Sequence, residues 1–340
     1  MNAKEFLKSN TVILDGGMGT LLQKAGLAAG EQPERWNITH ADTVVAIHKS
    51  YFDAGSNIVN TNTFGAKVLK FDVEELDSII GAAVRNAREA ARLSDGEQEK
   101  FVALDIGPTG KLLKPYGDLD FEDAVSVFAQ TVKLGVKYGV DLVTVETMND
   151  SYETKAALVA VKENCELPVI VTNAYGEDGK LMTGASPEAM VAMLEGLGAD
   201  AIGVNCSLGP KQLKSVVERM LAVASVPVAV KPNAGLPSSV DGKTVYDVSP
   251  EEFAKDVSDM VKSGARIVGG CCGTTPEYIA TLSRAVSKIT PVPLTDKEIC
   301  VVSSHTHAVT FGECPVLIGE RINPTGKTQL KEALVSGDMD

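Results

Sequence analysis

Three of the six cysteines stand where apolar segments end and glycines begin. Cys271 and Cys272 are adjacent within IVGGCCGTTP, residues 267–276, and Cys206 lies within VNCSLGP, residues 204–210. Three accounts of the adjacent pair are open: inert core thiols, a vicinal disulfide, or two ligands of a metal ion that shares Cys206. Three thiolates on zinc leave the fourth position open for a substrate, which is the pattern of catalytic rather than structural zinc sites.

The residue pattern favours the metal account without excluding the other two. A single buried thiol is a common core group, and this account suits Cys165, Cys300 and Cys314. Adjacent strand residues face opposite sides, so the Cys271–Cys272 pair fits a core poorly unless the flanking glycines turn the backbone. A vicinal disulfide requires unusual geometry and an oxidising compartment. The cysteines are not spaced as in a zinc finger, because Cys206 and Cys271 lie far apart in the sequence and no Cys-x-x-Cys occurs.

The other candidate residues share one feature, because each is a polar residue at the carboxyl end of an apolar, β-branched run. They are Asp15, Thr61, Asn62, Asp105, Glu146, Asn173, Asn205 and Asn233. If the runs are parallel strands of a barrel, their carboxyl ends meet on one rim, where the loops of such barrels carry the chemistry. We therefore expect these side chains and the three cysteines to surround one opening.

Eight such runs alternate with amphipathic stretches between the amino terminus and about residue 290. They are TVILDGG (11–17), NIVNTNTFG (57–65), FVALDIGPTG (101–110), DLVTVETM (141–148), PVIVTNAYG (168–176), AIGVNCSLG (201–209), VPVAVKPNAG (226–235) and ARIVGGCCG (265–273). Nearly continuous apolar character is typical of parallel strands buried on both faces. Helical periodicity lies between them, for example over residues 121–139 and 249–264. Eight units in series predict an α/β fold, a (β/α)8 TIM barrel, with a doubly wound open sheet as the alternative.

Composition limits the partners and the compartment. The 340 residues carry a net charge of -13 and 44% hydrophobic residues, with a pI near 4.9. Nucleic acid is an unexpected partner for so acidic a chain without clustered basic residues. No signal peptide and no apolar run of membrane-spanning length are present, so we expect a cytoplasmic protein without a membrane partner. Cysteines in that compartment are reduced, which favours metal binding over disulfides.

Three motifs together resemble the homocysteine S-methyltransferase family: LDGGMGT at residues 14–20, VNCSLGP at 204–210 and GGCCGTTP at 269–276. Within that family the chain is similar to the amino-terminal, homocysteine-binding module of the cobalamin-dependent members. The resemblance covers about residues 10–290 and implies a barrel that holds zinc on Cys206, Cys271 and Cys272. It implies an enzyme that transfers a methyl group to the thiol of L-homocysteine and forms methionine.

The resemblance also implies how the amino-acid end of homocysteine is bound. It places Asp15 and Glu146 near the substrate ammonium. The substrate carboxylate is expected at the backbone of the glycine turn that contains Gly17, with the Thr61 hydroxyl as a further donor. Zinc-bound thiolate is expected to be the methyl acceptor, so no side-chain base is required.

The carboxyl-terminal part is expected to differ from the barrel. We expect a zinc-dependent barrel over residues 1–290, a linker over 291–315, and over 316–340 the incomplete start of a following module. VLIGERINPTGK, residues 316–327, resembles the opening strand and loop of the folate-binding barrel that follows the homocysteine module in cobalamin-dependent relatives. The expected methyl donor is therefore methylcobalamin, presented by a corrinoid-binding module or protein and not bound by this chain. A betaine or sulfonium donor, and a non-catalytic docking barrel for a corrinoid protein, are the alternatives.

Overall fold

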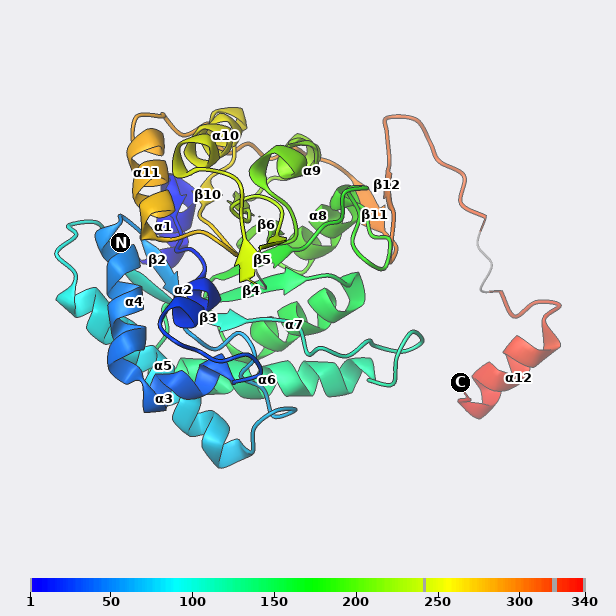
Figure 1. Ribbon diagram of the computed structural model, residues 1–340. Coiled ribbons are helices and arrows are strands. Elements are labelled where there is room, and N and C mark those ends of the chain that lie inside the picture. Colours follow the sequence, from blue (N-terminus) through cyan, green and yellow to red (C-terminus); the bar gives the residue numbers. More distant parts are fainter. Residues whose placement is uncertain (1, 241–242, 320–322, 339–340) are drawn as a thin grey trace.

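Eight parallel strands form one sheet that curls into a nearly closed barrel in the computed structural model (Figure 1), which describes residues 2–240, 243–319 and 323–338. The strands are β1 (Val12–Ile13), β2 (Ile58–Asn60), β3 (Phe101–Ile106), β4 (Leu142–Met148), β5 (Val169–Asn173), β6 (Ala201–Asn205), β7 (Val228–Lys231) and β10 (Ile267–Val268). Their spatial order is β1-β10-β7-β6-β5-β4-β3-β2.

The two ends of this sheet meet beside β1 and β2. Leu14 forms a parallel bridge with Ile58, and the Asn57 amide donates to the Ile13 carbonyl oxygen over 2.7 Å. The predicted TIM barrel is confirmed. The open doubly wound alternative is wrong, because the first and last strands in this order, β1 and β2, are joined by the Leu14–Ile58 bridge and do not form two free edges.

Helices surround the barrel, with α1 (Ala3–Ser9) and α2 (Met18–Lys24) at its two ends (Figure 1). The others around the barrel are the 3-10 turn η1 (Pro33–Arg35), α3 (Trp36–Thr39), α4 (Ala41–Asp53), α5 (Val73–Leu93), α6 (Phe121–Tyr138), α7 (Ser151–Asn164), α8 (Pro187–Gly196), α9 (Pro210–Val223), α10 (Pro250–Ser263) and α11 (Pro276–Val286). The Ser249 side chain accepts from the Glu252 amide and caps α10, and Gly139 ends α6 at φ 80°. In the described parts of the chain, no helix has the length and apolar character needed to cross a bilayer.

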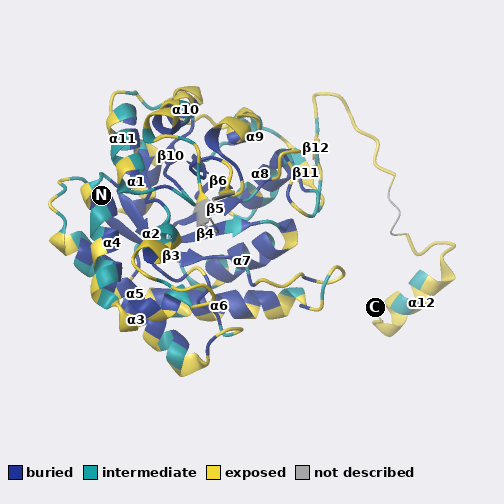
Figure 2. Cartoon of the chain, in the orientation of Figure 1, coloured by how far each residue is buried: buried dark blue, intermediate teal, exposed yellow. Residues whose placement is uncertain are grey.

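The core has two layers, and their arrangement decides which end of the barrel is open. Side chains between the strands and the outer helices form the larger cluster, and the buried strands stand out in Figure 2. A second cluster inside the barrel joins Phe6 and Leu7 of α1 to strand residues such as Val12 and Ile267. Helix α1 thus closes the amino-terminal end of the barrel, and the carboxyl-terminal ends of the strands remain available for a site.

A buried histidine in α4 is expected to make the free energy of unfolding depend on pH. The His48 side chain is 0% exposed, and neither of its ring nitrogens has a hydrogen-bond partner among the described residues. Burial lowers the pKa of His48 to about 3, from the usual 6.5. The unfolded chain therefore binds a proton below pH 6.5 that the folded chain does not bind, and the free energy of unfolding falls as the pH falls through this range.

We expect His48→Leu to remove this contribution. Between about pH 6 and pH 4, one such group changes the free energy of unfolding by about 1.4 kcal/mol per pH unit. Denaturant unfolding at pH 7.5, 5.5 and 4.5 should show a weaker acid destabilisation in the variant. The same replacement at exposed His40 is the control. Equal slopes in His48→Leu and wild type would show that His48 is not the titrating group.

The carboxyl-terminal segment differs from the expected linker. Strands β11 (Val301–Ser303) and β12 (Ala308–Thr310) pair as an antiparallel hairpin that contacts α8. Ser151 Oγ donates to the His305 carbonyl oxygen over 2.9 Å, and the Ser186 amide donates to that of Thr306 over 3.0 Å. Part of the predicted 291–315 linker is therefore folded against the barrel.

The predicted strand at the start of VLIGERINPTGK is not formed in its described part. Residues 316–319 belong to no strand and are exposed, whereas residues 320–322 lie outside the described residues. Backbone groups in a strand need a neighbouring strand for their hydrogen bonds, and none of the described segments offers one here. Helix α12 (Thr328–Ser336) follows, has no buried residue in the described chain, and lies away from the barrel in Figure 1.

Candidate active site

The open end of the barrel contains a cavity of about 610 Å³. All residues predicted to hold the metal or the substrate line it: Asp15, Gly17, Thr61, Glu146, Cys206, Cys271 and Cys272. They lie in the last residues of a strand or in the loop that follows it, and parallel strands end on the same rim. The structure therefore brings together five of the strand-end candidates, Asp15, Thr61, Asn62, Asp105 and Glu146, whereas Asn173, Asn205 and Asn233 are not among the described residues that line this cavity.

The three cysteines converge although they lie far apart in the sequence. Cys206 follows β6, and the other two follow β10, with β7 between these strands. The three Sγ atoms all lie within 4.8 Å of one another, and those of Cys206 and Cys272 are 3.9 Å apart. Zinc–sulfur bonds of about 2.3 Å in a tetrahedron place sulfurs about 3.8 Å apart. The donor set and its spacing fit a zinc ion, and the described residues contain no other such group of three.

Unusual backbone angles place these thiols. Cys206 and Ser207 have φ values of 59° and 54°, a left-handed conformation that is uncommon for residues other than glycine. The Cys206 amide donates to the Lys231 carbonyl oxygen over 3.0 Å, and the Cys272 amide donates to Asn233 Oδ1 over 3.1 Å. Strained residues held by such bonds are concentrated at functional sites.

Contacts among the three thiols shift their pKa values in opposite directions. Hydrogen bonds from Cys271 and Cys272 lower the pKa of the Cys206 thiol to about 3, and the same contact with Cys206 raises the pKa of Cys272 to about 11. One thiolate and two thiols are therefore the expected protonation state of the three cysteines alone. A metal ion would add the positive charge that makes three thiolates compatible.

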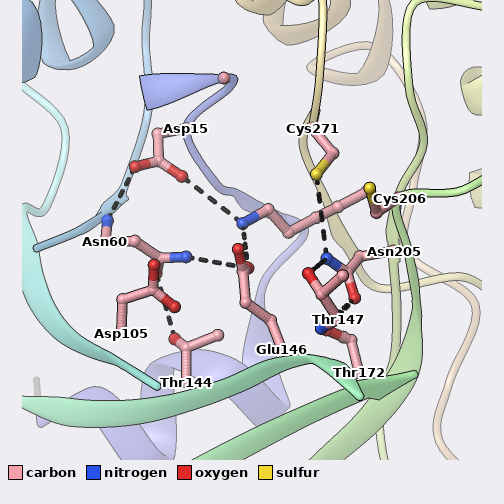
Figure 3. A network of polar contacts seen from close by, with 12 residues as sticks. Asp15, Asn60, Asp105, Thr144, Glu146, Thr147, Thr172, Asn205, Cys206 and Cys271 are labelled. Carbon is pink, nitrogen blue, oxygen red and sulfur yellow. Dashed lines mark hydrogen bonds and ion pairs between the residues drawn. The ribbon is translucent and has the colours of Figure 1, made fainter. Parts of the chain in front are cut away.

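The two predicted substrate carboxylates lie on the other side of the site, joined through Asn60 (Figure 3). The Asn60 amide donates to Asp15 Oδ2 over 2.8 Å, and Asn60 Nδ2 donates to Glu146 Oε2 over 3.0 Å. Thr144 Oγ1 fixes Asn60 by donating to its Oδ1 over 3.1 Å. This network holds Asp15 and Glu146 in fixed positions at the carboxyl ends of β1 and β4.

Sequence reasoning missed Lys231, which is the buried cation of this network. Its Nζ donates to Glu146 Oε2 over 2.6 Å and lies 3.7 Å from Asp15 Oδ1. Burial opposes its charge, but the carboxylates of Glu146 and Asp15 outweigh burial and raise the pKa of Lys231 above its usual value. A signal was present, because Lys231 is the lone charged residue within the apolar run VPVAVKPNAG.

A third carboxylate, Asp105, lies at the end of β3 and also lines the cavity. Burial and the charge of Glu146 raise its pKa well above the usual value. Burial likewise raises the pKa of Asp15 to about 6, although Lys231 opposes the shift. Oδ1 of Asp15 and Oδ1 of Asp105 are buried and accept no hydrogen bond from the described residues. These oxygens are available to a hydrogen-bond donor in the cavity.

The glycine turn packs tightly against the cysteine turn. A Cβ atom on Gly17 would lie 2.8 Å from the Cys271 carbonyl oxygen, so a larger residue does not fit there. The Gly17 amide donates to the Thr274 carbonyl oxygen over 3.1 Å. Thr61 Oγ1 lies 2.7 Å from Thr63 Oγ1 and accepts from the Asp105 amide over 3.2 Å. Gly17 and Thr61 line the cavity, and their contact with substrate stays a prediction.

Comparison with solved structures defines the class of fold. The metallated form of the homocysteine methyltransferase MmuM from Escherichia coli superimposes with a TM-score of 0.70 at 23% identity, over 82% of this chain and 96% of that chain. Its apo form gives a TM-score of 0.67 at 22% identity over the same shares. At this level of identity the likeness establishes the barrel fold.

Comparison of sequences defines the family. The family model for homocysteine S-methyltransferases matches residues 12–286, and the chain belongs to this family. Methionine synthase of Mycobacterium leprae is 31% identical over 358 residues, and that of Mycobacterium tuberculosis is 30% identical over 354. Each alignment covers 98% of this chain but only 30% of the relative. The chain thus spans about a third of the length of these relatives.

Proposed function

We propose that this chain binds zinc through Cys206, Cys271 and Cys272 and transfers a methyl group to the thiol of L-homocysteine, forming methionine. The observation that carries the proposal is the approach of the three thiols to within 4.8 Å at the open end of the barrel. Membership of the homocysteine S-methyltransferase family supports the substrate and the reaction. The metallated form of the MmuM structure supports a metal on this fold.

A thiol of pKa about 8.5 is mostly protonated at neutral pH, whereas the thiolate is the nucleophile. When bound, zinc supplies a coordination position that deprotonates the substrate thiol and holds it. The chain contributes three sulfur ligands fixed by the turns after β6 and β10. It also contributes Asp15 and Glu146, whose charges suit the substrate ammonium and which line the same cavity as the cysteines.

The proposed methyl donor is methylcobalamin, presented by a corrinoid-binding module or protein. Methylcobalamin would supply the methyl group, and Cys206, Cys271 and Cys272 would hold the zinc ion to which the acceptor thiolate binds. The name of the longer mycobacterial relatives, methionine synthase, supports a modular enzyme of this kind. On this view residues 1–290 are the homocysteine module and residues 316–340 begin the next one.

A betaine or sulfonium donor is the second candidate, because the same barrel fold occurs in the E. coli homocysteine methyltransferase MmuM. Incubation of the zinc-loaded chain with homocysteine and methylcobalamin should produce methionine and cob(I)alamin, which has its own visible spectrum. Activity with betaine or a sulfonium compound, and none with methylcobalamin, would overturn the donor assignment and leave the acceptor chemistry intact.

Zinc-edge X-ray absorption separates a catalytic site from a merely structural one. We expect three sulfur ligands at about 2.3 Å without substrate, and a fourth sulfur at the same distance when homocysteine is added. Methionine, whose sulfur carries no ionisable proton, is the control and should leave the sulfur count at three. An unchanged first shell with saturating homocysteine would contradict the proposed mechanism and favour the non-catalytic docking barrel.

A further inference from the structure

We infer that Lys231 is a substrate-binding residue that selects thiols carrying a carboxylate, by donating hydrogen bonds from its ammonium to that carboxylate. The inference rests on the function proposed above and adds a positive subsite to it. In this arrangement the substrate ammonium lies toward Glu146, and one oxygen of the substrate carboxylate lies toward Lys231. The other carboxylate oxygen is left for the glycine turn that contains Gly17, where the family resemblance places it.

The hydrogen bonds of Lys231 leave capacity for a ligand. An ammonium group has three N–H donors. One donates to Glu146 Oε2 over 2.6 Å, and the 3.7 Å to Asp15 Oδ1 is too long for a hydrogen bond. Within the described chain, no other acceptor meets Lys231 Nζ, although the side chain is only 3% exposed. A buried ammonium with unfilled donors is costly, and a substrate oxygen would satisfy it.

The position of Lys231 suits this contact. The residue ends β7, which lies between the strands that lead to Cys206 and to Cys271, and it lines the same cavity as these thiols. Its Nζ lies at this cavity between the carboxylates of Glu146 and Asp15. A ligand whose sulfur lies at the cysteines extends its amino-acid end toward this pair.

The charge of the cavity explains why a cation is required there. Asp15, Asp105 and Glu146 all line it, together with the three cysteines. A substrate carboxylate entering beside Glu146 and Asp15 meets negative charge, and like charges brought together oppose binding. Lys231 is the buried cation in the described lining, whereas Lys24 at the same cavity is exposed. Lys231 thus offsets the repulsion where the carboxylate has to lie.

The alternative is that Lys231 only balances the charges of Glu146 and Asp15. The two roles differ in one respect. A balancing role affects every thiol that uses Glu146 and Asp15, whereas a carboxylate subsite affects only ligands that carry a carboxylate. Ligands that lack one or the other charged group therefore distinguish them.

The test uses the zinc-loaded chain and calorimetric titration with three thiols: L-homocysteine, 4-mercaptobutanoate, which lacks the ammonium, and 3-aminopropane-1-thiol, which lacks the carboxylate. In Lys231→Met, we expect the affinity for both carboxylate-bearing thiols to fall about ten- to hundred-fold, the effect of one hydrogen bond to a charged group. The affinity for 3-aminopropane-1-thiol should be unchanged or higher. Lys67→Met, which removes another fully buried ammonium outside this cavity lining, is the matched control and should keep the wild-type preference.

A uniform loss for all three thiols, or no loss for homocysteine, would overturn the inference. If Lys231→Met does not fold, two measurements remain. Lys231→Gln keeps a donor for Glu146 and should show the same selective loss. In the wild-type chain, L-homocysteine should bind at least about ten-fold more tightly than its carboxamide, and equal affinities would also overturn the inference. Failure of the wild-type chain to bind any of these thiols in a zinc-dependent way would instead refute the proposed function itself.

Discussion

Replacing Cys271 with alanine is expected to abolish stoichiometric zinc binding and with it methyl transfer to homocysteine. The Sγ atom of Cys271 belongs to the only group of three metal-ligating atoms found among the described residues. Two remaining thiols leave zinc two positions short of the tetrahedron that it prefers in proteins. The loss of activity should be complete within detection, because the substrate thiol then lacks the ion that keeps it deprotonated.

The barrel itself should survive this change. Cys271 is half-buried on the rim, and it lies outside both core clusters. Zinc content by mass spectrometry, far-UV circular dichroism and turnover test the expectation together. Cys300→Ala and Cys314→Ala, at exposed thiols in the carboxyl-terminal segment, are the matched controls and should retain zinc and activity. Full zinc occupancy and full turnover in Cys271→Ala would show that the ligand assignment is wrong.

The barrel was predictable because its sequence signals are local. Each strand is a short apolar run that ends in a polar or glycine residue, and helices such as α10 begin at a Ser-Pro pair whose serine caps them. The convergence of Cys206 with Cys271 also followed from the fold, since parallel strands end on one rim. A strand-end pattern therefore predicts which residues share an opening.

The pairing within that opening was not predictable from the same signals. Lys231 and Glu146 are 85 residues apart and meet across the barrel, so neither sequence position reveals its partner. The hairpin at residues 301–310 was missed for a different reason. Its strands β11 and β12 have three residues each and gain their packing from α8, and such tertiary support has no local signature. Contacts between distant segments decided both features.

The Lys231–Glu146 pair gives the second large effect, which is expected for Glu146→Gln. The glutamine has the shape of the glutamate and can still accept from Lys231 and Asn60, but it carries no charge to balance the buried ammonium. Breaking a buried ion pair by neutralising one partner costs about 3–5 kcal/mol when the other charge stays uncompensated. Asp15, at 3.7 Å from Lys231 Nζ, compensates for part of this charge, so we expect the free energy of unfolding to fall by about 3 kcal/mol.

The same substitution should weaken homocysteine binding by about ten- to hundred-fold, because the substrate ammonium loses a carboxylate partner. Zinc content should not change, since the cysteine ligands are left in place. Denaturant unfolding and calorimetric titration measure the two effects separately. Glu153→Gln, at a buried carboxylate that accepts from Thr109 and does not line the cavity, is the matched control for affinity.

A double substitution separates the contribution of the pair from that of the substrate contact. In Lys231→Met/Glu146→Gln both charges are absent, so the loss of stability should be smaller than the sum of the two single losses, with a coupling of about 1–3 kcal/mol. Homocysteine affinity should not recover with stability, because the double variant lacks both the Glu146 carboxylate for the substrate ammonium and the Lys231 ammonium for the substrate carboxylate. Recovery of wild-type affinity in the double variant would show that Glu146 acts only as the counter-charge of Lys231 and does not meet the substrate.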